Sequence, residues 1–451
     1  MQDALFDGME ADAGTGANGH GAPSGPPRVR RPDRAQLLMR ACCLEDLLPP
    51  GHTARLVERV VGRLDLSAFY GPIAARGSAP GRSATDPALL VALWLYAAIE
   101  GIGCGREIDR LCTCRDDFRW LCGGVTVNYH TLNDFRVGHE AALDRLFSNV
   151  LVMLATRGLV RVDRICQDGV RIRASAGTSS FHRAATTRGL LKRAQEHLDG
   201  LKKQMDPAAS SRAAAARERA ARERVERLEA ALEELPEIEA ARARWTRGED
   251  RQKEARASGT DPQARIMRMS NGGYNPAYNV QLAADPVSRA LVGVDVTNQG
   301  ADSAQSEPMR EQVHRRLGGV NGPDGKEPAV REHVADGGYA DAVVVERAEK
   351  AGVTMVVPPR ERKLAPGTDP ATGVRESDPA AEARWRERMS TDDSRAIYAQ
   401  RGSTIETINA DLKEHRGLVR LQVRGLRKAR CVALWSALAY NIMHFAPALL
   451  T

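Results

Sequence analysis

The chain has 451 residues, which is long enough to bury a sizeable core and to form two or three structural parts. Its 65 Lys and Arg residues exceed its 58 Asp and Glu residues, and the net charge of +7 permits a polyanionic partner without requiring one. The eight cysteines are scattered, which argues against a secreted disulfide framework. The N-terminus is acidic and Gly-rich, unlike a signal peptide, and the apolar runs are too short to span a bilayer, so we expect a cytoplasmic protein.

Changes of composition and period divide the chain into four parts. Residues 1–34 are rich in Gly, Pro, Ala and Asp and end in a basic run, which predicts a disordered arm. Residues 35–157 follow a helical period and predict an all-α N-terminal domain. An α/β core is expected at 158–180 and 259–451, and it is interrupted at 181–258 by charged, helix-forming sequence.

Within the helical domain, residues 87–99 predict a buried helix with Asp86 as its N-cap and Pro87 in its first position. A later helix begins near His130 and carries Arg136. Short helices joined by turns fit a helix-turn-helix DNA reader, and an ordinary helical bundle explains the same pattern equally well. Cysteines 104, 112, 114 and 122 lie close in sequence but miss the paired spacing of a zinc site.

The core begins with a predicted strand at 160–168, which the Asp168-Gly169 turn dipeptide is expected to end. The insertion then predicts a helical hairpin or coiled coil, with leucines 228, 232 and 235 on one stripe and prolines 207 and 236 as its breaks. A solvated arm is its default role, and dimerisation is the alternative.

Strands resume after the insertion. Residues 278–284 and 291–297 predict a hairpin around a turn at 285–289. A helix is expected at 307–317, and residues 333–357 predict a strand that stops at Asp336, a helix and a second strand, which together form a parallel crossover. An apolar helix is expected at 432–446.

The stretch from Tyr398 to Lys413 combines a tyrosine, an arginine, a glutamate and a lysine in and just before one predicted helix. Ser403 and Glu406 fit a helix N-cap and its capping-box glutamate, so we expect a helix from Ser403 to about residue 416 with Tyr398 and Arg401 just before it. Its apolar positions share one buried face: Ile405, Ile408 and Leu412. Glu406 and Lys413 are two turns apart and share another face.

Two predicted strand ends and this helix therefore each supply a carboxylate, at Asp168, Asp336 and Glu406. Three converging carboxylates are what two-metal phosphoryl-transfer chemistry requires, because hard oxygen ligands hold Mg²⁺. Each Asp-Gly is also a common turn, and Glu406 in a capping box would need no metal.

The ordered motifs resemble the DDE-type transposases of bacterial insertion sequences, in the branch with a helical N-terminal domain (groups five and eleven-eighty-two). Coverage is roughly residues 36–446. The motifs that carry the resemblance are Phe118–Gly124, His130–Arg136, Cys166–Ser175, Asp261–Met267, Gly273–Gln281, Val334–Tyr339, and Tyr398-x2-Arg401-x4-Glu406-x6-Lys413 followed by His415-Arg-Gly417. Val170 stands where the family often has Thr, and four residues rather than three separate Arg401 from Glu406.

The resemblance implies an RNase H-like catalytic core in which Asp168, Asp336 and Glu406 hold Mg²⁺, with Mn²⁺ as a substitute. Phosphodiester hydrolysis at transposon ends and attack of the freed 3′-hydroxyl on target DNA would follow. A homodimer in the synaptic complex and association with the nucleoid are also implied.

By the same resemblance, Tyr398, Arg401 and Lys413 would contact DNA. Arg171 and Arg173 would extend the phosphate track, although ordinary surface cations explain these two arginines equally well, and Arg136 would contribute from the helical domain. We expect Glu406 to fold back on its cap without metal and to turn toward Asp168 with metal and DNA.

Two other functions fit the same residues. One is an RNase H-like nuclease that cuts without joining strands, which an assay with pre-cut ends would distinguish. The other is an inactive or domesticated transposase-derived DNA-binding protein with an idle triad, which should bind Mg²⁺ or Mn²⁺ poorly.

Overall fold

The computed structural model describes residues 35, 43–77, 83–204, 212–245, 254–323, 325–363 and 366–450. Residues Met1–Cys43 and Leu44–Thr451 cluster as separate units, and the fold described here is that of the second unit. The predicted basic arm and Pro207 lie outside the described residues. No helix in the described ranges is both long and apolar enough to cross a membrane.

The N-terminal part is helical, as the period predicted. In α3 (Pro87–Ile99) the Asp86 side chain accepts a hydrogen bond from the Ala88 amide at 2.9 Å and Pro87 takes the first position, which confirms the predicted cap. Most of this helix is buried because its sequence is apolar on every side. The other helices of this part are α1 (Thr53–Val61), α2 (Ser67–Tyr70), α4 (Gly105–Cys114), α5 (Asp116–Cys122), α6 (Tyr129–Gly138) and α7 (Glu140–Thr156).

The core is one mixed sheet with the order β4-β5-β1-β7-β8, in which β6 also pairs with β5. The pairings of β1 with β5, β5 with β6 and β4 with β5 are antiparallel, whereas β7 runs parallel to both β1 and β8. The strands are β1 (Arg164–Arg173), β4 (Arg265–Arg268), β5 (Tyr274–Ala284), β6 (Leu291–Thr297), β7 (Glu332–Val334) and β8 (Thr354–Val356). The predicted β5–β6 hairpin and the parallel crossover through α11 (Ala342–Lys350) are confirmed.

Strand β1 differs from its prediction because it does not end at Asp168-Gly169. It continues to Arg173, and Gly169 pairs with Gln281 of β5. The glycine is needed there for close packing and not for a turn: a Cβ at this position would lie 2.4 Å from Asp302 Oδ1 and 2.5 Å from Gln281 Nε2. Asp168 is therefore held in the middle of a paired strand.

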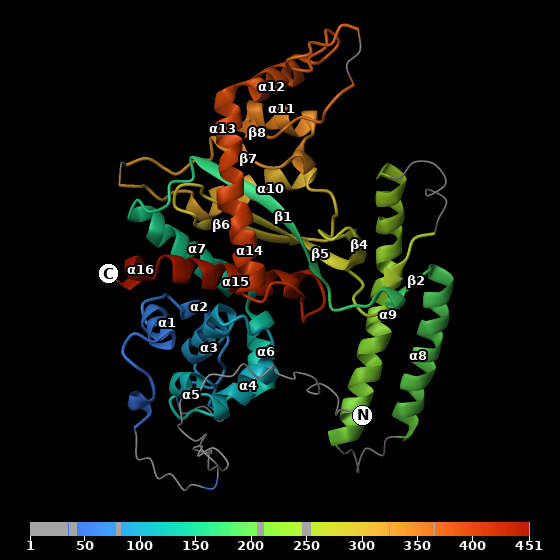
Figure 1. The fold of residues 1–451 in the computed structure, drawn as a ribbon. Coiled ribbons are helices and arrows are strands. Elements are labelled where there is room, and N and C mark those ends of the chain that lie inside the picture. Colours follow the sequence, from blue (N-terminus) through green and yellow to red (C-terminus); the bar gives the residue numbers. More distant parts are fainter. Residues whose placement is uncertain are drawn as a thin grey trace, which may run out of the picture. The chain divides into compact units, whose positions relative to one another are not determined.

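A single C-terminal helix joins the helical part to the sheet. Helix α15 (Leu426–His444) packs on β6 and on α3, α6 and α7 (Figure 1). The Asn441 side chain bonds both the amide and the carbonyl of Leu291 in β6, at 2.9 and 2.8 Å. One continuous apolar core therefore runs from the N-terminal helices to the sheet. The remaining helices are α10 (Ser306–Leu317), α12 (Ala380–Ser390), α13 (Asp392–Arg401), α14 (Thr407–Glu414) and α16 (Ala446–Leu450).

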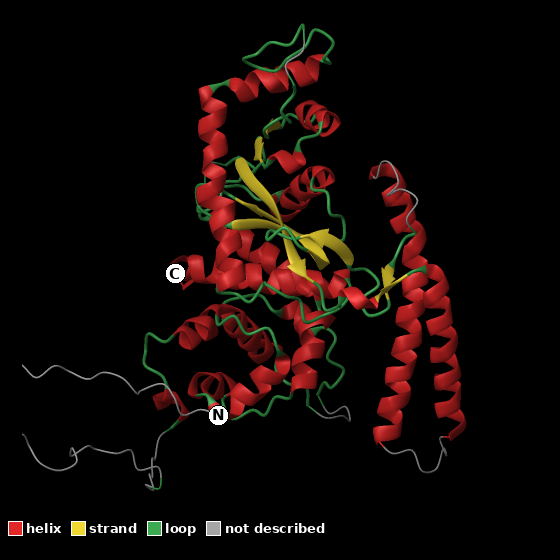
Figure 2. Cartoon of the chain, turned by 45° about the vertical axis from the view of Figure 1, so that its right-hand side comes forward, coloured by secondary structure: helices red, strands yellow, loops and turns green. Residues whose placement is uncertain are grey.

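The insertion is a helical hairpin on a two-stranded stem. Helices α8 (Ala184–Gln204) and α9 (Arg212–Trp245) pack against each other, and β2 (Phe181–His182) pairs with β3 (Ala257–Ser258) at the start of α8, while α9 runs past this stem (Figure 2). Leu228 and Leu235 of the predicted stripe are buried. The prediction that Pro236 breaks the helix is wrong: α9 continues through it, although the proline nitrogen cannot donate a backbone hydrogen bond.

Candidate active site

The two aspartates lie side by side because of strand register. Strands β1 and β7 are parallel, and Cys166 is paired with Val334. Asp168, within β1, and Asp336, just past the end of β7, each follow this pair by two residues, so the two aspartates are at the same level of adjacent segments. Asp336 lies just past the end of β7, where its side chain accepts a hydrogen bond from the Gly338 amide at 2.8 Å.

The carboxyl of Asp168 is poorly solvated. Burial raises its pKa to about 6, against an ordinary value near 3.8. The positive charge of Arg401 and a hydrogen bond from the Gly169 amide oppose this shift, whereas the neighbouring carboxylates of Asp336 and Asp302 add to it. Because the ionised form of Asp168 is destabilised by burial and by nearby carboxylates, a cation bound at this point would be stabilised by these charges.

The helix that carries Glu406 begins earlier than predicted. Helix α13 runs directly into a π-helical segment, Gly402–Glu406, and then into α14 without a break. The prediction of a capping box is wrong, because Ser403 lies inside this continuous helical run and its hydroxyl donates to the Gln400 carbonyl at 3.1 Å. Tyr398 and Arg401 consequently lie in the helix. The predicted buried face is confirmed at Ile405, Ile408 and Leu412.

The π-helical segment brings Arg401 and Glu406 together. Residues five apart on an α-helix differ in direction by about 140°. An i→i+5 turn instead returns to the same face after five residues. The Arg401 guanidinium accordingly lies 2.6 Å from Glu406 Oε1. The additional residue between Arg401 and Glu406, noted in the sequence, is thus absorbed by one wide turn.

Arg401 forms ion pairs with two of the three predicted ligands. It lies 3.6 Å from Asp168 Oδ2 as well as 2.6 Å from Glu406 Oε1. Burial acts to lower the pKa of Arg401, but the charges of Asp168, Tyr398 and Glu406 outweigh it and raise that pKa. The expectation that Glu406 folds back on a cap is therefore corrected: its half-exposed carboxylate is held by Arg401 instead.

Sequence reasoning missed Asn409. Its side-chain Nδ2 donates to Asp168 Oδ2 at 2.9 Å, while its Oδ1 is buried without a hydrogen-bond partner. The residue itself is only 7% exposed. Its spacing was a usable signal, because Asn409 is one turn after Glu406 and one turn before Lys413 on the same face.

A buried polar layer on the other face of β1 was also missed. Asp302 accepts hydrogen bonds from Asn279 at 2.6 Å and Gln281 at 2.8 Å, and it forms an ion pair with Arg171 at 2.8 Å. Asn279 and Gln281 are paired opposite Arg171 and Gly169, so this layer supports β1 directly behind Asp168. Nothing local in the sequence marks Asp302, which lies in a loop before α10.

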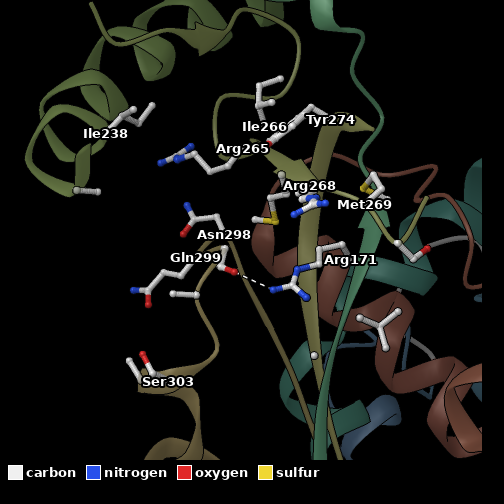
Figure 3. A pocket seen from close by; sticks show the side chains of 18 of the residues that line it. Arg171, Ile238, Arg265, Ile266, Arg268, Met269, Tyr274, Asn298, Gln299 and Ser303 are labelled. Carbon is white, nitrogen blue, oxygen red and sulfur yellow. Dashed lines mark hydrogen bonds between the residues drawn. The ribbon is translucent and has the colours of Figure 1, made fainter. Parts of the chain in front are cut away.

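A cavity of about 2090 Å³ opens beside these residues. Asp168, Glu406, Asn409 and Lys413 line it from β1 and α14, and Arg171 lines it with its guanidinium also bonded to the Gly300 carbonyl. Figure 3 shows Arg171 near Arg268, with the loop at Gln299 beyond it and Ile238 of α9 on the far side. The insertion thus contributes a wall to the same cavity.

The remaining predicted residues lie elsewhere. Arg173 is exposed at the end of β1 and does not line the cavity, and Tyr398 lies under Arg401 with its ring centre 5.8 Å from the guanidinium. Arg136 is buried: it donates to the Gly103 carbonyl at 2.7 Å and covers the Trp94 ring. Burial lowers its pKa to about 10. Arg136 is therefore a packing residue, and its expected DNA contact is not retained.

The donor set suits a hard divalent cation. The described residues contain no cluster of three His, Cys, Asp or Glu side chains already arranged around one point. However, Asp168 and Asp336 adjoin, Asn409 Oδ1 is a buried oxygen without a partner, and the pKa of Asp168 is raised. Carboxylate and amide oxygens are the ligands of Mg²⁺. Glu406 would complete the set once it leaves Arg401.

Two family models match successive ranges of the chain. Residues 247–442 match the family model described as Transposase DDE domain, a range that contains Asp336, Glu406 and Lys413 and begins after Asp168 and the helical hairpin. Residues 42–137 match the model Transposase domain (DUF772). No curated protein and no solved structure matches the chain. The chain is therefore similar to transposase families over two successive ranges, one in the helical part and one in the sheet-containing core.

Proposed function

We propose that this protein is an insertion-sequence DDE transposase with an RNase H-like core, in which Asp168, Asp336 and Glu406 hold divalent metal. The observation that carries the proposal is the register that sets Asp168 beside Asp336, with the helix of Arg401, Glu406 and Asn409 laid against Asp168. The sheet, in which four strands joined by antiparallel pairings are continued by two parallel ones, fits the core expected of this family. Groups five and eleven-eighty-two remain the proposed branch.

Mg²⁺, or Mn²⁺ in its place, would polarise the scissile phosphate and activate the attacking oxygen when bound. The reaction is hydrolysis of a phosphodiester at the transposon end, followed by attack of the freed 3′-hydroxyl on target DNA. Each step exchanges one oxygen on phosphorus for another, so no covalent protein intermediate is required. The chain itself supplies the carboxylates, orients them and binds the phosphates.

The two ion pairs of Arg401 suggest that it exchanges carboxylate partners for a phosphate when substrate binds. Without substrate it neutralises Asp168 and holds Glu406 away from it. When Glu406 turns toward Asp168, the guanidinium is released for a phosphate, which it can bind in bidentate fashion. Tyr398 packs against Arg401 and limits where it can move. Lys413 and Arg171, which line the cavity, are proposed as further phosphate contacts, and Arg173 as a more distant one.

The test is Glu406→Gln in the full-length protein, assayed on DNA that carries the element's own ends. We expect loss of Mg²⁺-dependent end cleavage and unchanged DNA binding, because the variant keeps the shape of the side chain but not its charge. Glu414→Gln is the matched control: it makes the same change two turns later on α14, and Glu414 also lines the cavity. Undiminished cleavage by Glu406→Gln would overturn the proposed triad.

Two further measurements complete the test. Joining of pre-cut ends to a target plasmid separates a transposase from a nuclease that only cuts. The logarithm of the DNA-binding constant should fall steeply and linearly with the logarithm of salt concentration, because phosphate contacts release counterions. Size measurements with and without end DNA would show whether a homodimer forms on the ends.

A further inference from the structure

The ribbon formed by β4 and β5 carries an unusual exposed face. Tyr274 is 65% exposed and Ile266 is 44% exposed, and both line the cavity that contains Asp168. They are the only strongly exposed large hydrophobic side chains, among the residues the structure describes, that do so. Figure 3 shows the two side chains at the rim of the cavity, between Arg265 and Met269.

Strand register explains why these side chains share a face. Arg268 is paired directly with Tyr274, and Ile266 is paired with Pro276. Directly opposed residues of an antiparallel pair project from the same face, and so do residues two apart on one strand. Met267, which projects the other way, is buried. Tyr274, Ile266 and Arg268 therefore form one open patch, which we call the Tyr274 face.

The surroundings of the Tyr274 face favour an anionic ligand. Eight basic and five acidic side chains line the cavity. Arg268 is exposed, and no carboxylate of a described residue forms an ion pair with it, unlike Arg265, which pairs with Glu234 of α9. The insertion adds arginines to the lining at positions 183, 242, 244 and 256. An aromatic ring set in a cationic groove is the arrangement that binds single-stranded nucleic acid, because bases stack on the ring while cations take the phosphates.

We propose that the Tyr274 face binds an unpaired stretch of the DNA substrate, with one base stacked on the Tyr274 ring and a neighbouring phosphate on Arg268. The inference rests on the proposed transposase function and adds a site that the triad does not require. A base inside a duplex has both faces covered by its neighbours, so only an unpaired base offers a face to the ring. The insertion forms the opposite wall of this groove.

The strand geometry limits where along the DNA this base lies. Tyr274 is eight residues before Leu282, which is paired with Asp168. At about 3.4 Å per residue the two sites are at most about 27 Å apart. For a straight path at about 3.4 Å per nucleotide, as in duplex DNA, this corresponds to about eight nucleotides from the bond at Asp168, and to fewer in an extended single strand.

The test compares binding of a fluorescein-labelled dT16 strand with binding of a 16-base-pair duplex. Stacking tolerates any base, so dT16 is a suitable probe before the terminal sequence is known. We expect Tyr274→Ala to weaken dT16 binding by about 5- to 150-fold, the range for loss of one stacked base, and to leave duplex binding unchanged. Tyr274→Phe should bind dT16 like the wild type because the ring remains. Val287→Ala is the control, since Val287 is exposed in the β5–β6 turn outside the cavity.

A strand with one 2-aminopurine gives a second readout. Its emission should change on binding to the wild type and to Tyr274→Phe but not to Tyr274→Ala. The proposal is overturned if Tyr274→Ala binds dT16 like the wild type, if Tyr274→Phe fails as Tyr274→Ala does, or if duplex binding falls equally. None of these results depends on cleavage. Failure of the triad hypothesis would appear in the cleavage test of Glu406→Gln, whereas failure of the present proposal would appear only in single-strand binding, so the two are distinguishable.

Discussion

Replacing Asp168 by Asn should stabilise the protein at neutral pH while abolishing cleavage. The folded-state pKa of about 6 lies above the ordinary value near 3.8. The native state therefore holds this proton more tightly than the unfolded chain, and the stability of the wild type falls as pH rises from about 4 to about 6. A shift of about two pH units corresponds to about 3 kcal/mol of destabilisation at pH 7, which the uncharged Asn does not incur.

Loss of a hydrogen bond at residue 168 offsets part of this gain in unfolding free energy. The Gly169 amide donates to Asp168 Oδ1 and Asn409 donates to Oδ2, and an Asn side chain can accept only one of these hydrogen bonds. Losing the other costs about 1 kcal/mol, which leaves a net gain of about 2 kcal/mol at pH 7. If residues 44–451 unfold as one unit, this gain raises Tm by roughly 2–3 °C.

The assay is thermal unfolding of the wild type and Asp168→Asn between pH 4 and pH 8, without divalent metal. The difference in unfolding free energy should rise by about 3 kcal/mol across this range and should be zero or slightly unfavourable to the variant at pH 4. Asp163→Asn is the control, because Asp163 is an exposed carboxylate one residue before the same strand. If the difference in unfolding free energy between the variant and the wild type does not change with pH, the reasoning is refuted, because burial would then not destabilise the ionised form of Asp168.

Two other substitutions test packing, one at Arg136 in the helical part and one at Gly169 next to Asp168. Arg136→Ala should lower the unfolding free energy in urea by about 2–4 kcal/mol, because it removes the bond to Gly103 and the contact with Trp94, and should leave the salt dependence of DNA binding unchanged. A large loss of DNA affinity with normal stability would contradict its structural role. Gly169→Ala should destabilise the protein by about 1–3 kcal/mol and reduce cleavage, because its Cβ would meet Asp302 at 2.4 Å. Gly189→Ala is the control without a steric clash, because nothing lies within 4 Å, and it should stabilise helix α8 by up to about 1 kcal/mol.

The elements that sequence predicted well are those whose signal is local. Helix α3 has its cap and proline in adjacent positions, and the β7–α11–β8 crossover has apolar runs bounded by glycines. The buried stripe of Ile405, Ile408 and Leu412 follows from periodicity alone. In each case the residues that decide the structure are within a few positions of one another, so pattern and propensity are sufficient.

The errors arose where a local signal competed with packing. Asp168-Gly169 looks like a turn, but pairing with β5 carries the strand through it. Ser403 looks like a cap, but α13 extends into α14 through the π-helical segment, whose apolar residues pack on the core. Pro236 looks like a break, but the packed face of α9 continues beyond it to Ile238. Tertiary burial outweighed a preference of about one to a few kcal/mol in each case.

By itself the sequence predicted a helical N-terminal part, an α/β core and a helical insertion, and the resemblance of its ordered motifs led to the proposal of the three carboxylates. Only the tertiary structure decided that Arg401 joins Glu406 to Asp168, that Asn409 contacts Asp168, and that Asp302 supports β1 from behind. These contacts join residues as far apart as 241 positions. They depend on register and on which faces pack together, and those are set by the whole core and not by any stretch of the chain.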